Sequence, residues 1–362
     1  MKRIVHITSV RELTSGQRQQ LHSEHKAALM LQTANWTTLA YHTDQPKLSF
    51  EKRIPLFFRP ILLRNLYIWL KILSYQNDYD LVLLRHMTFD PFSIVFSPLI
   101  KNRISVHHAK EIEELKLVRK GWKGRLASML EVIAGKVLIK NSVAVIGVTE
   151  EIGRYQNIRR RLNKIVFSYP NGIDLPSIPL AQDCREKEDL NIAFICGTFS
   201  EWHGLDLLIK SVKEYTKKDL NFKIHLIGKL NNSYINSIKD KECFINHGFL
   251  AKTEYLDIVS KCDIALGSLA MFRQNLNEGA TLKVREMLAL GIPVYSTHID
   301  TSLQDNSIFY LNDKVLDIEN LVNYGLEMKK YSRQQVRNDT ARFIDKTSIL
   351  QSLIIDINNA LF

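Results

Sequence analysis

The sequence has 362 residues, of which 45% are hydrophobic and 24% charged; this composition excludes a disordered chain, and the length fits two globular domains. Its net charge of +11 lies entirely in the first half, because residues 1–189 hold 29 Lys and Arg against 18 Asp and Glu, whereas residues 190–362 hold 20 of each. The first half is therefore expected to attract an anionic partner, such as a phosphorylated substrate, an anionic membrane surface or a nucleic acid.

Cysteine usage and hydropathy also restrict the class of protein. The four cysteines form neither a C-x-x-C pair nor a zinc-binding spacing, so we expect reduced, structural thiols in a cytosolic protein. The apolar run over residues 4–10 contains His6, Thr8 and Ser9, and it predicts a first strand rather than a signal peptide. No uncharged apolar run reaches about 18 residues, so no membrane-spanning helix is expected.

The first half begins with a strand, a polar loop and a helix. Residues 3–8 are predicted as the strand, residues 9–16 as the loop, with Ser15 and Gly16 at its end, and residues 17–34 as the helix. Ligands bind at such loops in α/β domains. Neither G-x-G-x-x-G nor G-x-x-x-x-G-K-[ST] occurs, which argues against a standard dinucleotide oxidoreductase and a P-loop NTPase.

A second strand is predicted over residues 36–42, and an unusually apolar segment follows at residues 53–73. Arginines and a lysine are interspersed among its large apolar residues. One interpretation is a basic, aromatic segment that faces a membrane, and the other is a loop followed by a helix that packs on the sheet. We favour the packed helix for most of this segment.

Two adjacent histidines, His107 and His108, end a predicted strand at residues 103–107. The carboxyl end of a strand in an open α/β sheet is a common place for ligand chemistry, and acidic residues follow the pair at 111–114. We prefer His108 as the functional residue and keep His107 as its rival. A loop histidine without a chemical role is the alternative interpretation.

Basic residues gather around Trp122, where the sequence predicts two helical pieces over residues 115–139. Gly121 and Gly124 indicate a bend between the pieces. The basic cluster is either a solvated face or a surface that attracts phosphate. Further strands of this half are predicted at residues 79–85, 142–148 and 164–169, with a helix at 91–100 and a linker at 175–189.

The second half repeats the alternation of strands and helices. Strands are predicted at residues 191–196, 222–228, 243–246, 263–268 and 308–311, and helices at 205–217, 234–239, 253–261, 282–290, 318–330, 333–345 and 348–359. Two consecutive series of this kind predict an α/β protein with two Rossmann-like domains and a cleft between them.

Two glutamates flank the start of the predicted helix at residues 282–290. Glu278 is expected in the loop before this helix, and Glu286 about two turns inside it. First-turn amides have no internal partner and attract anions, so they would hold the diphosphate of a nucleotide-sugar. Glu286 would accept hydrogen bonds from the ribose, and Glu278 would face the sugar. The alternative is an ordinary surface helix with a solvated Glu286.

Three motifs resemble those of the retaining GT-B-fold glycosyltransferases of family 4, the glycosyltransferases group 1. They are the E-x7-E pair followed by Gly-x-Pro-Val, the turn Pro170-Asn171-Gly172-Ile173-Asp174, and the loop over residues 197–206. The resemblance covers most of residues 150–300 and is looser in residues 1–149. It implies an acceptor-binding domain at residues 1–175, with a C-terminal helix at 346–362 packed back on it, and a donor-binding domain at residues 190–345.

The resemblance also implies roles for individual residues. His108 and Glu278 would be catalytic. The acceptor side would include Ser15, Gly16, His107 and Asn171, and the donor would contact Gly197, Thr198, His203, Gly204, Phe249, Leu250, Gly279, Ala280, Thr281, Leu282, Lys283 and Glu286.

The donor loop departs from the family pattern at two positions. Thr198 stands where a basic residue usually follows the first glycine, and His203 stands where a lysine is usual. Arg and Lys carry a permanent charge, whereas the unperturbed pKa of His is about 6.5 and rises beside a phosphate. His203 would therefore serve more weakly than the usual lysine, or Lys283 would take part of its load.

On this resemblance the chain is expected to be a hexosyltransferase. It would move a sugar, with retention at the anomeric carbon, from a UDP- or GDP-linked donor to a glycan or lipid-linked saccharide in bacterial surface polysaccharide biosynthesis. No metal or other cofactor is expected, because no Asp-x-Asp motif stands in a suitable position. The expected location is the cytoplasm, and peripheral contact with an anionic membrane at the inner face of the cell membrane stays open.

Two alternatives from other classes are kept. The chain could bind a nucleotide-sugar without catalysis, since the usual donor-loop cations are missing. A nucleic-acid-binding protein would suit the charge of +11, but no recognised nucleic-acid motif occurs and the charge is spread rather than striped, so no nucleic-acid partner is expected.

Overall fold

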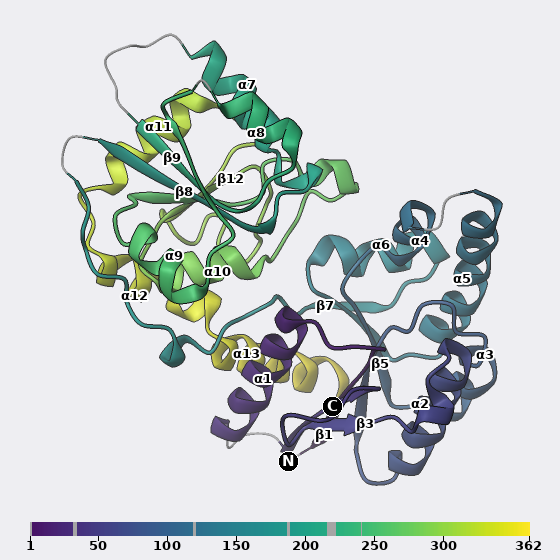
Figure 1. The fold of residues 1–362 in the computed structure, drawn as a ribbon. Helices are drawn as coiled ribbons and strands as arrows, with labels where there is room; N and C mark the ends of the chain where they lie inside the picture. Colours follow the sequence, from purple (N-terminus) through teal and green to yellow (C-terminus); the bar gives the residue numbers. More distant parts are fainter. Residues whose placement is uncertain (1, 32–34, 119–120, 187–188, 216–221, 240) are drawn as a thin grey trace. The chain divides into compact units, whose positions relative to one another are not determined.

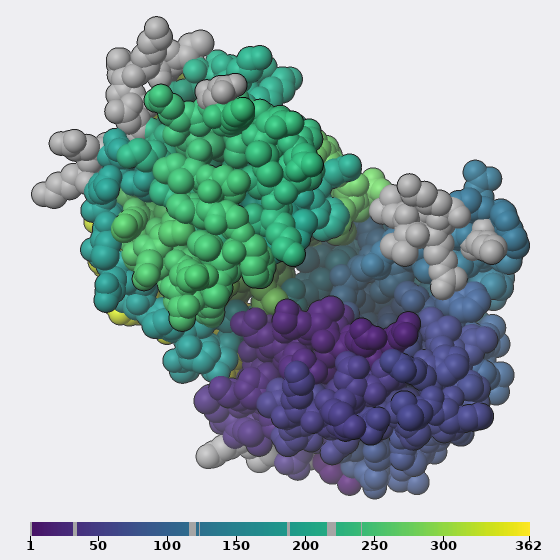
Figure 2. Space-filling model, viewed as in Figure 1, coloured from purple at the N-terminus to yellow at the C-terminus, as the bar shows by residue number. Residues whose placement is uncertain are grey.

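Two separately packed units make up the chain in the computed structural model (Figure 1). The structure describes residues 2–362 apart from 32–34, 119–120, 187–188, 216–221 and 240, and apart from the side chains of 116–118 and 123. Unit 1 is formed by Met1–Asp174 together with Lys346–Phe362, and unit 2 by Leu175–Asp345. Each unit is compact, as the space-filling view shows (Figure 2).

Unit 1 is built on a parallel sheet that has seven strands among the described residues, in the order β3-β2-β1-β4-β5-β6-β7. The strands are β1 (Arg3–Ser9), β2 (Asn35–His42), β3 (Glu51–Arg53), β4 (Leu81–Arg85), β5 (Arg103–His107), β6 (Ala144–Gly147) and β7 (Ile165–Ser168). The order reverses between β1 and β4, and ligands bind at such a switch point in open α/β sheets.

Helices cover both faces of this sheet. They are α1 (Ser15–Met30), η1 (Leu56–Phe58), α2 (Ile61–Tyr75), α3 (Ser93–Phe96), η2 (Ser97–Leu99), α4 (Glu111–Val118), α5 (Trp122–Lys140), α6 (Glu150–Arg160) and α13 (Lys346–Leu361). One core joins the sheet to α1 and α13, including Leu350 and Leu353. The other core joins the opposite face to α2 through Ile68, Trp69 and Ile72, so most of α2 packs on the sheet as favoured above.

Unit 2 repeats the design with a parallel sheet that has six strands among its described residues, in the order β10-β9-β8-β11-β12-β13. These are β8 (Leu190–Thr198), β9 (Phe222–Lys229), β10 (Phe244–Gly248), β11 (Ile264–Leu266), β12 (Val294–Ser296) and β13 (Tyr310–Asn312). The predicted pair of Rossmann-like α/β folds is confirmed by the two sheets.

The helices of unit 2 also form two layers. They are η3 (Leu175–Ser177), η4 (Glu201–His203), α7 (Leu205–Glu214), α8 (Asn232–Ile238), α9 (Lys252–Val259), η5 (Met271–Gln274), α10 (Leu282–Ala289), α11 (Ile318–Met328) and α12 (Arg333–Ile344). Figure 1 shows α7, α8 and α11 on one side of the sheet and α9, α10 and α12 on the other. The end of the helix predicted at residues 205–217 falls partly outside the described residues.

Several predicted boundaries are wrong for local reasons. Ser15 and Gly16 lie in the first turn of α1 rather than in a loop, because Thr14 and Gln17 cap the helix through reciprocal hydrogen bonds of 3.3 and 3.1 Å. The helix predicted at residues 91–100 is divided into α3 and η2, where Pro98 lacks an amide donor. The two helical pieces around Trp122 are α4 and α5, and Gly121 before α5 has a φ of 81°.

Candidate functional site

In unit 2, the strand order reverses between β8 and β11, and the loops that follow these strands are joined there. The Leu269 amide donates a hydrogen bond of 3.0 Å to the carbonyl of His203. Gly204 follows with a φ of 76°, and a Cβ at this position would lie 2.8 Å from Leu269 Cβ and 2.9 Å from its carbonyl carbon. This close approach and this φ both require a glycine, which fixes the shape of the loop.

His203 is uncharged near neutral pH. The Ser200 amide donates a hydrogen bond of 2.9 Å to its Nδ1, so that nitrogen carries no proton. Loss of hydration, followed by the nearby Lys283 ammonium, lowers the pKa of His203 to about 4. The neutral ring then keeps its proton on Nε2, where it can donate a hydrogen bond to a phosphate oxygen. Without a ligand, His203 is therefore a neutral donor rather than a substitute for the usual cation.

Lys283 is the cation of this loop region. Its Nζ lies 3.7 Å from Cys196 Sγ and 5.1 Å from the ring centroid of Phe194. Burial lowers the pKa of Lys283. Neither of these two contacts is a carboxylate, so they do not neutralise the partly desolvated ammonium of Lys283. An anionic ligand would stabilise this charge better than the thiol and the ring do.

The start of α10 offers an anion-binding end. Thr281 is the N-cap residue, but its side chain makes no capping hydrogen bond. Its Oγ1 is buried and has no hydrogen-bond partner within the described part of the chain. The amides of Leu282 and Lys283 belong to the first turn, for which an α-helix supplies no internal acceptor. A buried hydroxyl and these amides together suit a phosphate oxygen.

The predicted contribution of Gly279 to this end is corrected. Its amide donates a hydrogen bond of 2.8 Å to the carbonyl of Ile299, beside the parallel bridge that joins Glu278 to Ile299. The Gly279 amide is thus already engaged and cannot also hold a diphosphate. Glycine is needed here for packing, because a Cβ would lie 2.8 Å from both His298 Cδ2 and Met271 Sδ. The buried Ala280 follows, before the anion-binding turn.

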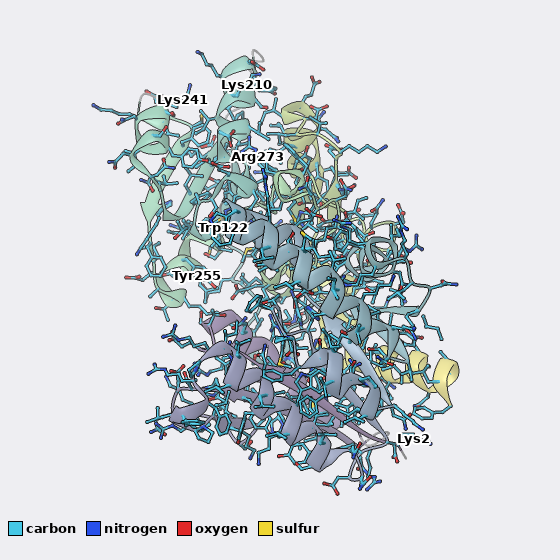
Figure 3. The ribbon with its side chains drawn as sticks, turned by 90° about the vertical axis from the view of Figure 1, so that its right-hand side faces the viewer. Lys2, Trp122, Lys210, Lys241, Tyr255 and Arg273 are labelled. Carbon is cyan, nitrogen blue, oxygen red and sulfur yellow. The ribbon has the colours of Figure 1, made fainter. Side chains whose placement is uncertain are left out.

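Glu286 is the fifth residue of α10, so it lies just over one turn inside the helix and not about two. Its Oε1 accepts a hydrogen bond from the Tyr255 hydroxyl and contacts Lys252 Nζ, both at 2.8 Å (Tyr255 is labelled in Figure 3). Burial and this carboxylate raise the pKa of Tyr255. Since both contacts engage Oε1, the carboxylate keeps Oε2 for a further hydrogen-bond donor.

The loop after β10 presents an aromatic side chain. Phe249 is 66% exposed, and Lys229 Nζ at the end of β9 lies 5.7 Å from its ring centroid. Leu250 is half-buried beside it. Gly197 and Thr198, at the end of β8, are both exposed. An exposed ring at a strand end is a surface on which a planar base can stack.

The sequence did not indicate the buried charges that hold α10 in place. Arg285 makes a bidentate ion pair with Asp300, and the second of its contacts, Nη2 to Oδ1, is 3.0 Å long. Both side chains are almost completely buried. Their separation of fifteen residues, across β12, gives no local pattern. The pair fixes the helix that carries Lys283 and Glu286, and it is a positioning element.

A pocket of about 270 Å³ opens at the carboxyl ends of β1, β4 and β5, at the switch point of unit 1. Basic and polar side chains dominate its wall. The lining residues are Ser9, Val10, Arg11, Ile61, Arg64, Asn65, Arg85, His86, Met87, Thr88, Val106, His108, Ala109, Glu111 and Glu114. The pocket therefore suits a polar, anionic ligand.

The two candidate histidines are placed differently. His107 is fully buried, with Nδ1 2.8 Å from Glu111 Oε1 and Nε2 2.9 Å from Ser105 Oγ. His108 has an exposed side chain that lines the pocket. Two causes lower the pKa of His108 well below its usual value: first the loss of hydration next to surrounding protein atoms, and second the positive charge of the Arg85 guanidinium. Of the two, only His108 is exposed and lines the pocket.

Arg64 and Arg85 have no ion-pair or side-chain hydrogen-bond partner among the described residues, and Arg64 Nε is buried. Asn65 is 2% exposed, and its Nδ2 is also buried without a partner. Burial and then the Arg11 guanidinium lower the pKa of Arg64. Burial lowers the pKa of Arg85, and the carboxylates of Glu111 and Glu114, which also line the pocket, partly oppose this shift.

The remaining predicted acceptor residues lie around α1. Ser15 is exposed in its first turn and Gly16 half-buried, while Asn171 is half-buried in the turn after β7. This turn is fixed to α1 by two hydrogen bonds of Gln20. Its Nε2 donates one of 2.7 Å to the Gly172 carbonyl, and its Oε1 accepts one of 3.2 Å from the Gly172 amide. The fold therefore brings Asn171 next to α1, but Ser15, Gly16 and Asn171 do not line the pocket of unit 1.

Neither a metal-binding cluster nor a membrane-spanning helix occurs in the part of the chain that the structure describes. No group of three or more His, Cys, Asp and Glu side chains is arranged to hold a metal ion. No helix there combines the length and apolarity needed to cross a membrane.

Comparison with known proteins places this architecture. Residues 180–305 match the family described as glycosyl transferases group 1. The chain resembles the lipopolysaccharide outer core galactosyltransferase WaaB with a TM-score of 0.63 and 11% identity, over 98% of this chain and 99% of that chain. It resembles a sucrose-phosphate synthase from Thermosynechococcus elongatus with a TM-score of 0.64 and 12% identity, over 99% of this chain and 100% of that chain. It also resembles Anabaena HepE in complex with UDP and glucose, with a TM-score of 0.58 and 14% identity, over 99% of this chain and 100% of that chain. No curated protein matches it in sequence.

Two Rossmann-like units with these structural likenesses define the GT-B fold, as predicted. The match to the glycosyl transferases group 1 covers residues 180–305, which all belong to unit 2. The predicted enzyme class is therefore confirmed at the level of glycosyl transfer.

Proposed function

We propose that the protein transfers a sugar from a UDP- or GDP-linked donor to a glycan or lipid-linked saccharide, with retention at the anomeric carbon and without a metal. The biological setting would be the synthesis of a bacterial surface polysaccharide in the cytoplasm, at the inner face of the cell membrane. The observation that carries this proposal is the buried Thr281 hydroxyl without a partner in the described structure, two residues before Lys283, whose ammonium acts on the pKa of His203. The likeness to HepE, whose structures contain UDP or UDP-glucose, supports a uridine donor.

The chemistry asked of unit 2 is electrostatic. When the bond between the anomeric carbon and the diphosphate breaks, its electron pair stays on the diphosphate and positive charge develops on the sugar ring. The Lys283 ammonium, the Nε2–H of His203 and the first-turn amides of α10 would stabilise the diphosphate. The Glu278 carboxylate would stabilise the ring or hold its hydroxyls. Glu286 Oε2 would accept a hydrogen bond from a ribose hydroxyl. Phe249 and the backbone of Leu250 would contact the base.

Unit 1 would hold the acceptor. His108 is the accessible histidine of the pocket, and with a lowered pKa it is neutral near pH 7 and can take a proton from an acceptor hydroxyl. Arg64, Arg85 and Asn65 would bind an anionic group of the acceptor, because their polar atoms lack partners in the described structure. A lipid diphosphate-linked saccharide has such a group. Asn171, Ser15 and Gly16 would lie further from the reacting hydroxyl.

Thermal shift with UDP, GDP, ADP and their common sugars tests the donor, since a ligand that binds only the folded protein raises its melting temperature. Transfer assays would then compare the parent with Glu278→Ala and His108→Ala. Loss of transfer in both variants, with nucleotide binding kept in His108→Ala, is the expected result. An active parent unaffected by both substitutions would defeat the assignment. The anomeric configuration of the product, read by NMR, tests retention.

A non-catalytic nucleotide-sugar-binding protein is the second candidate, because Thr198 and the neutral His203 occupy positions where the donor loop usually has cations. It predicts a thermal shift with a nucleotide-sugar but neither transfer nor hydrolysis. Binding to random DNA at micromolar concentration, lost as salt rises, would instead favour a nucleic-acid function.

A further inference from the structure

Helix α5 of unit 1 buries mostly small side chains and one carboxylate along residues 122–135. Its buried positions include Ala127, Ser128, Glu131 and Ala134. Glu131 is 1% exposed and anchors the helix: Oε1 is 2.7 Å from His86 Nε2, and Oε2 accepts a hydrogen bond of 3.2 Å from the Phe89 amide. A surface helix usually buries its large apolar side chains. Along residues 122–135 the interior instead takes small residues and a carboxylate, and large apolar side chains of α5 are buried only further along, at Leu138 and Ile139.

Five large apolar side chains of α5 point outward. They are Trp122, Leu126, Met129, Leu130 and Ile133, which are 70, 48, 63, 43 and 55% exposed. Their spacing of three and four residues places them on one side of the helix. Figure 3 labels Trp122, the first residue of α5, on the side of unit 1 that faces the viewer. Single exposed apolar residues are ordinary, but a continuous stripe of five indicates a binding surface.

The polar residues that share this exposed side are all basic. Arg125, Lys136 and Lys140 are exposed, and Glu131, the only acidic residue of α5, is the buried one. A basic side with bulky apolar residues and no exposed acid matches the chemistry of an anionic lipid surface, in which a helix lies in the interfacial plane.

The apolar surface continues onto the neighbouring elements. Helix α3 packs against α5, and Ile94, Val95 and Leu99 of α3 and η2 are 43, 63 and 57% exposed. The combined area is therefore wider than one helix stripe. A broad apolar surface is what in-plane contact with acyl chains requires, whereas a groove would be needed to receive a peptide helix.

We propose that the outward side of α5, together with α3 and η2, is a docking surface for an anionic membrane. A second copy of the chain is disfavoured as the occupant, because a symmetric pair would oppose Arg125, Lys136 and Lys140 to the same residues. The assignment places membrane contact at residues 94–99 and 122–140, not in the segment 53–73, most of which packs on the sheet. It also stands apart from the proposed reaction, since vesicle binding needs neither sugar substrate.

Co-sedimentation of the full chain with vesicles tests the surface. The parent should bind vesicles that contain phosphatidylglycerol and bind phosphatidylcholine vesicles weakly, with binding reduced by salt. Met129→Glu combined with Ile133→Glu should weaken binding by at least about tenfold. The matched control is Val315→Glu, which changes a 78% exposed apolar residue of unit 2 and should bind like the parent. Circular dichroism and the thermal shift with nucleotide should be unchanged in all variants.

A charge variant separates the lipid from other occupants. Lys136→Glu with Lys140→Glu keeps every apolar side chain and should abolish the preference for phosphatidylglycerol. Equal vesicle binding by the parent and by Met129→Glu/Ile133→Glu would overturn the proposal. So would a parent that ignores vesicles but forms a dimer, in sedimentation velocity, that the apolar double variant does not form. Failure of donor binding would concern the proposed reaction alone and leave this result intact.

Discussion

The Ser200 amide donates to Nδ1 of His203 at 2.9 Å, and this one contact assigns the imidazole tautomer. The ring offers Nε2–H to a ligand without carrying charge. His203→Ala should therefore lower kcat/KM for the nucleotide-sugar by about tenfold to a hundredfold, which is the effect of one hydrogen bond to a charged group. His203→Gln, which also presents an N–H, should recover part of this loss. Steady-state kinetics with varied donor measure both.

The pH profile supplies the control for this role. With a pKa of about 4 in the free protein, His203 is neutral throughout pH 6 to 8. Its protonation should therefore add no step to kcat/KM for the donor in that range. A step that vanishes in His203→Gln would show that the free protein uses the imidazolium form instead.

Glu286 and Tyr255 form a pair whose two members should differ in effect. Glu286→Ala removes both carboxylate oxygens and should raise the Kd for UDP, or for the nucleotide that thermal shift selects, by about tenfold. Tyr255→Phe removes only a partner of Oε1 and should change the Kd by no more than about threefold. Isothermal titration measures both values. A larger effect for Tyr255→Phe would mean that the hydroxyl itself contacts the nucleotide.

Arg64 should determine the affinity for an anionic acceptor. Arg64→Ala should raise KM for a phosphorylated acceptor by about tenfold or more and leave the Kd for the nucleotide unchanged, because a charge-assisted contact is lost only in unit 1. Lys101→Ala, an exposed cation outside the pocket lining, is the control. Inorganic phosphate and glucuronate as inhibitors distinguish a phosphate from a carboxylate. Equal KM values for Arg64→Ala and Lys101→Ala would remove the arginine from acceptor binding.

Glu24 should make stability depend on acid pH. Despite burial, contacts with His6, Lys346 and Thr38 lower its pKa from 4.5 to about 2, and Oε2 accepts a hydrogen bond of 2.9 Å from Tyr169. Because the folded pKa is below the unfolded one, the stabilisation is present above about pH 4.5 and is lost as pH falls toward 2. It amounts to about 3 kcal/mol.

Urea unfolding of the parent and of Glu24→Gln from pH 7 down to pH 3.5 tests this contribution. The difference in free energy of unfolding should shrink as pH falls below about 4.5. A difference that is constant with pH would assign the effect of the substitution to packing and hydrogen bonding alone.

The Arg285–Asp300 pair should be far more important for stability than an exposed ion pair. Asp300→Asn leaves a buried guanidinium without its counter-charge and should reduce the free energy of unfolding by about 3–5 kcal/mol. Glu150→Gln breaks the exposed pair with Arg154 and should change it by less than about 1 kcal/mol. Calorimetry should show the larger loss in one transition, that of unit 2.

The alternation of strands and helices was predictable because most strands are short apolar runs buried on both faces. β3 was missed for the opposite reason, since Glu51-Lys52-Arg53 contains no apolar residue. Glu51 is nevertheless 3% exposed, because Arg18 Nε at 2.7 Å and His42 Nε2 at 3.1 Å hold its carboxylate. These partners come from other elements, so no local pattern reports them.

The same limit applies to the candidate site. Motif spacing found Glu286 but not Tyr255, which is 31 residues away on another helix. Arg64 and Arg85 come from α2 and from the end of β4, and only the folded sheet brings both to one pocket. The exposed apolar side chains of α5 were not singled out from the sequence, because helical spacing defines a face and not the direction in which it points. That direction is set by Glu131 and its partners.

Unit 1 is assembled from both ends of the chain, since α13 completes the core that also contains Ile4 and Leu81. During synthesis on a ribosome, the first 174 residues therefore emerge without α13, and the part of the sheet face that α13 covers beside α1 stays exposed. Unit 2 is continuous and can reach its final structure before the unit that precedes it. Premature termination near residue 345 would accordingly damage the amino-terminal unit, and it would leave an apolar surface for chaperones to protect.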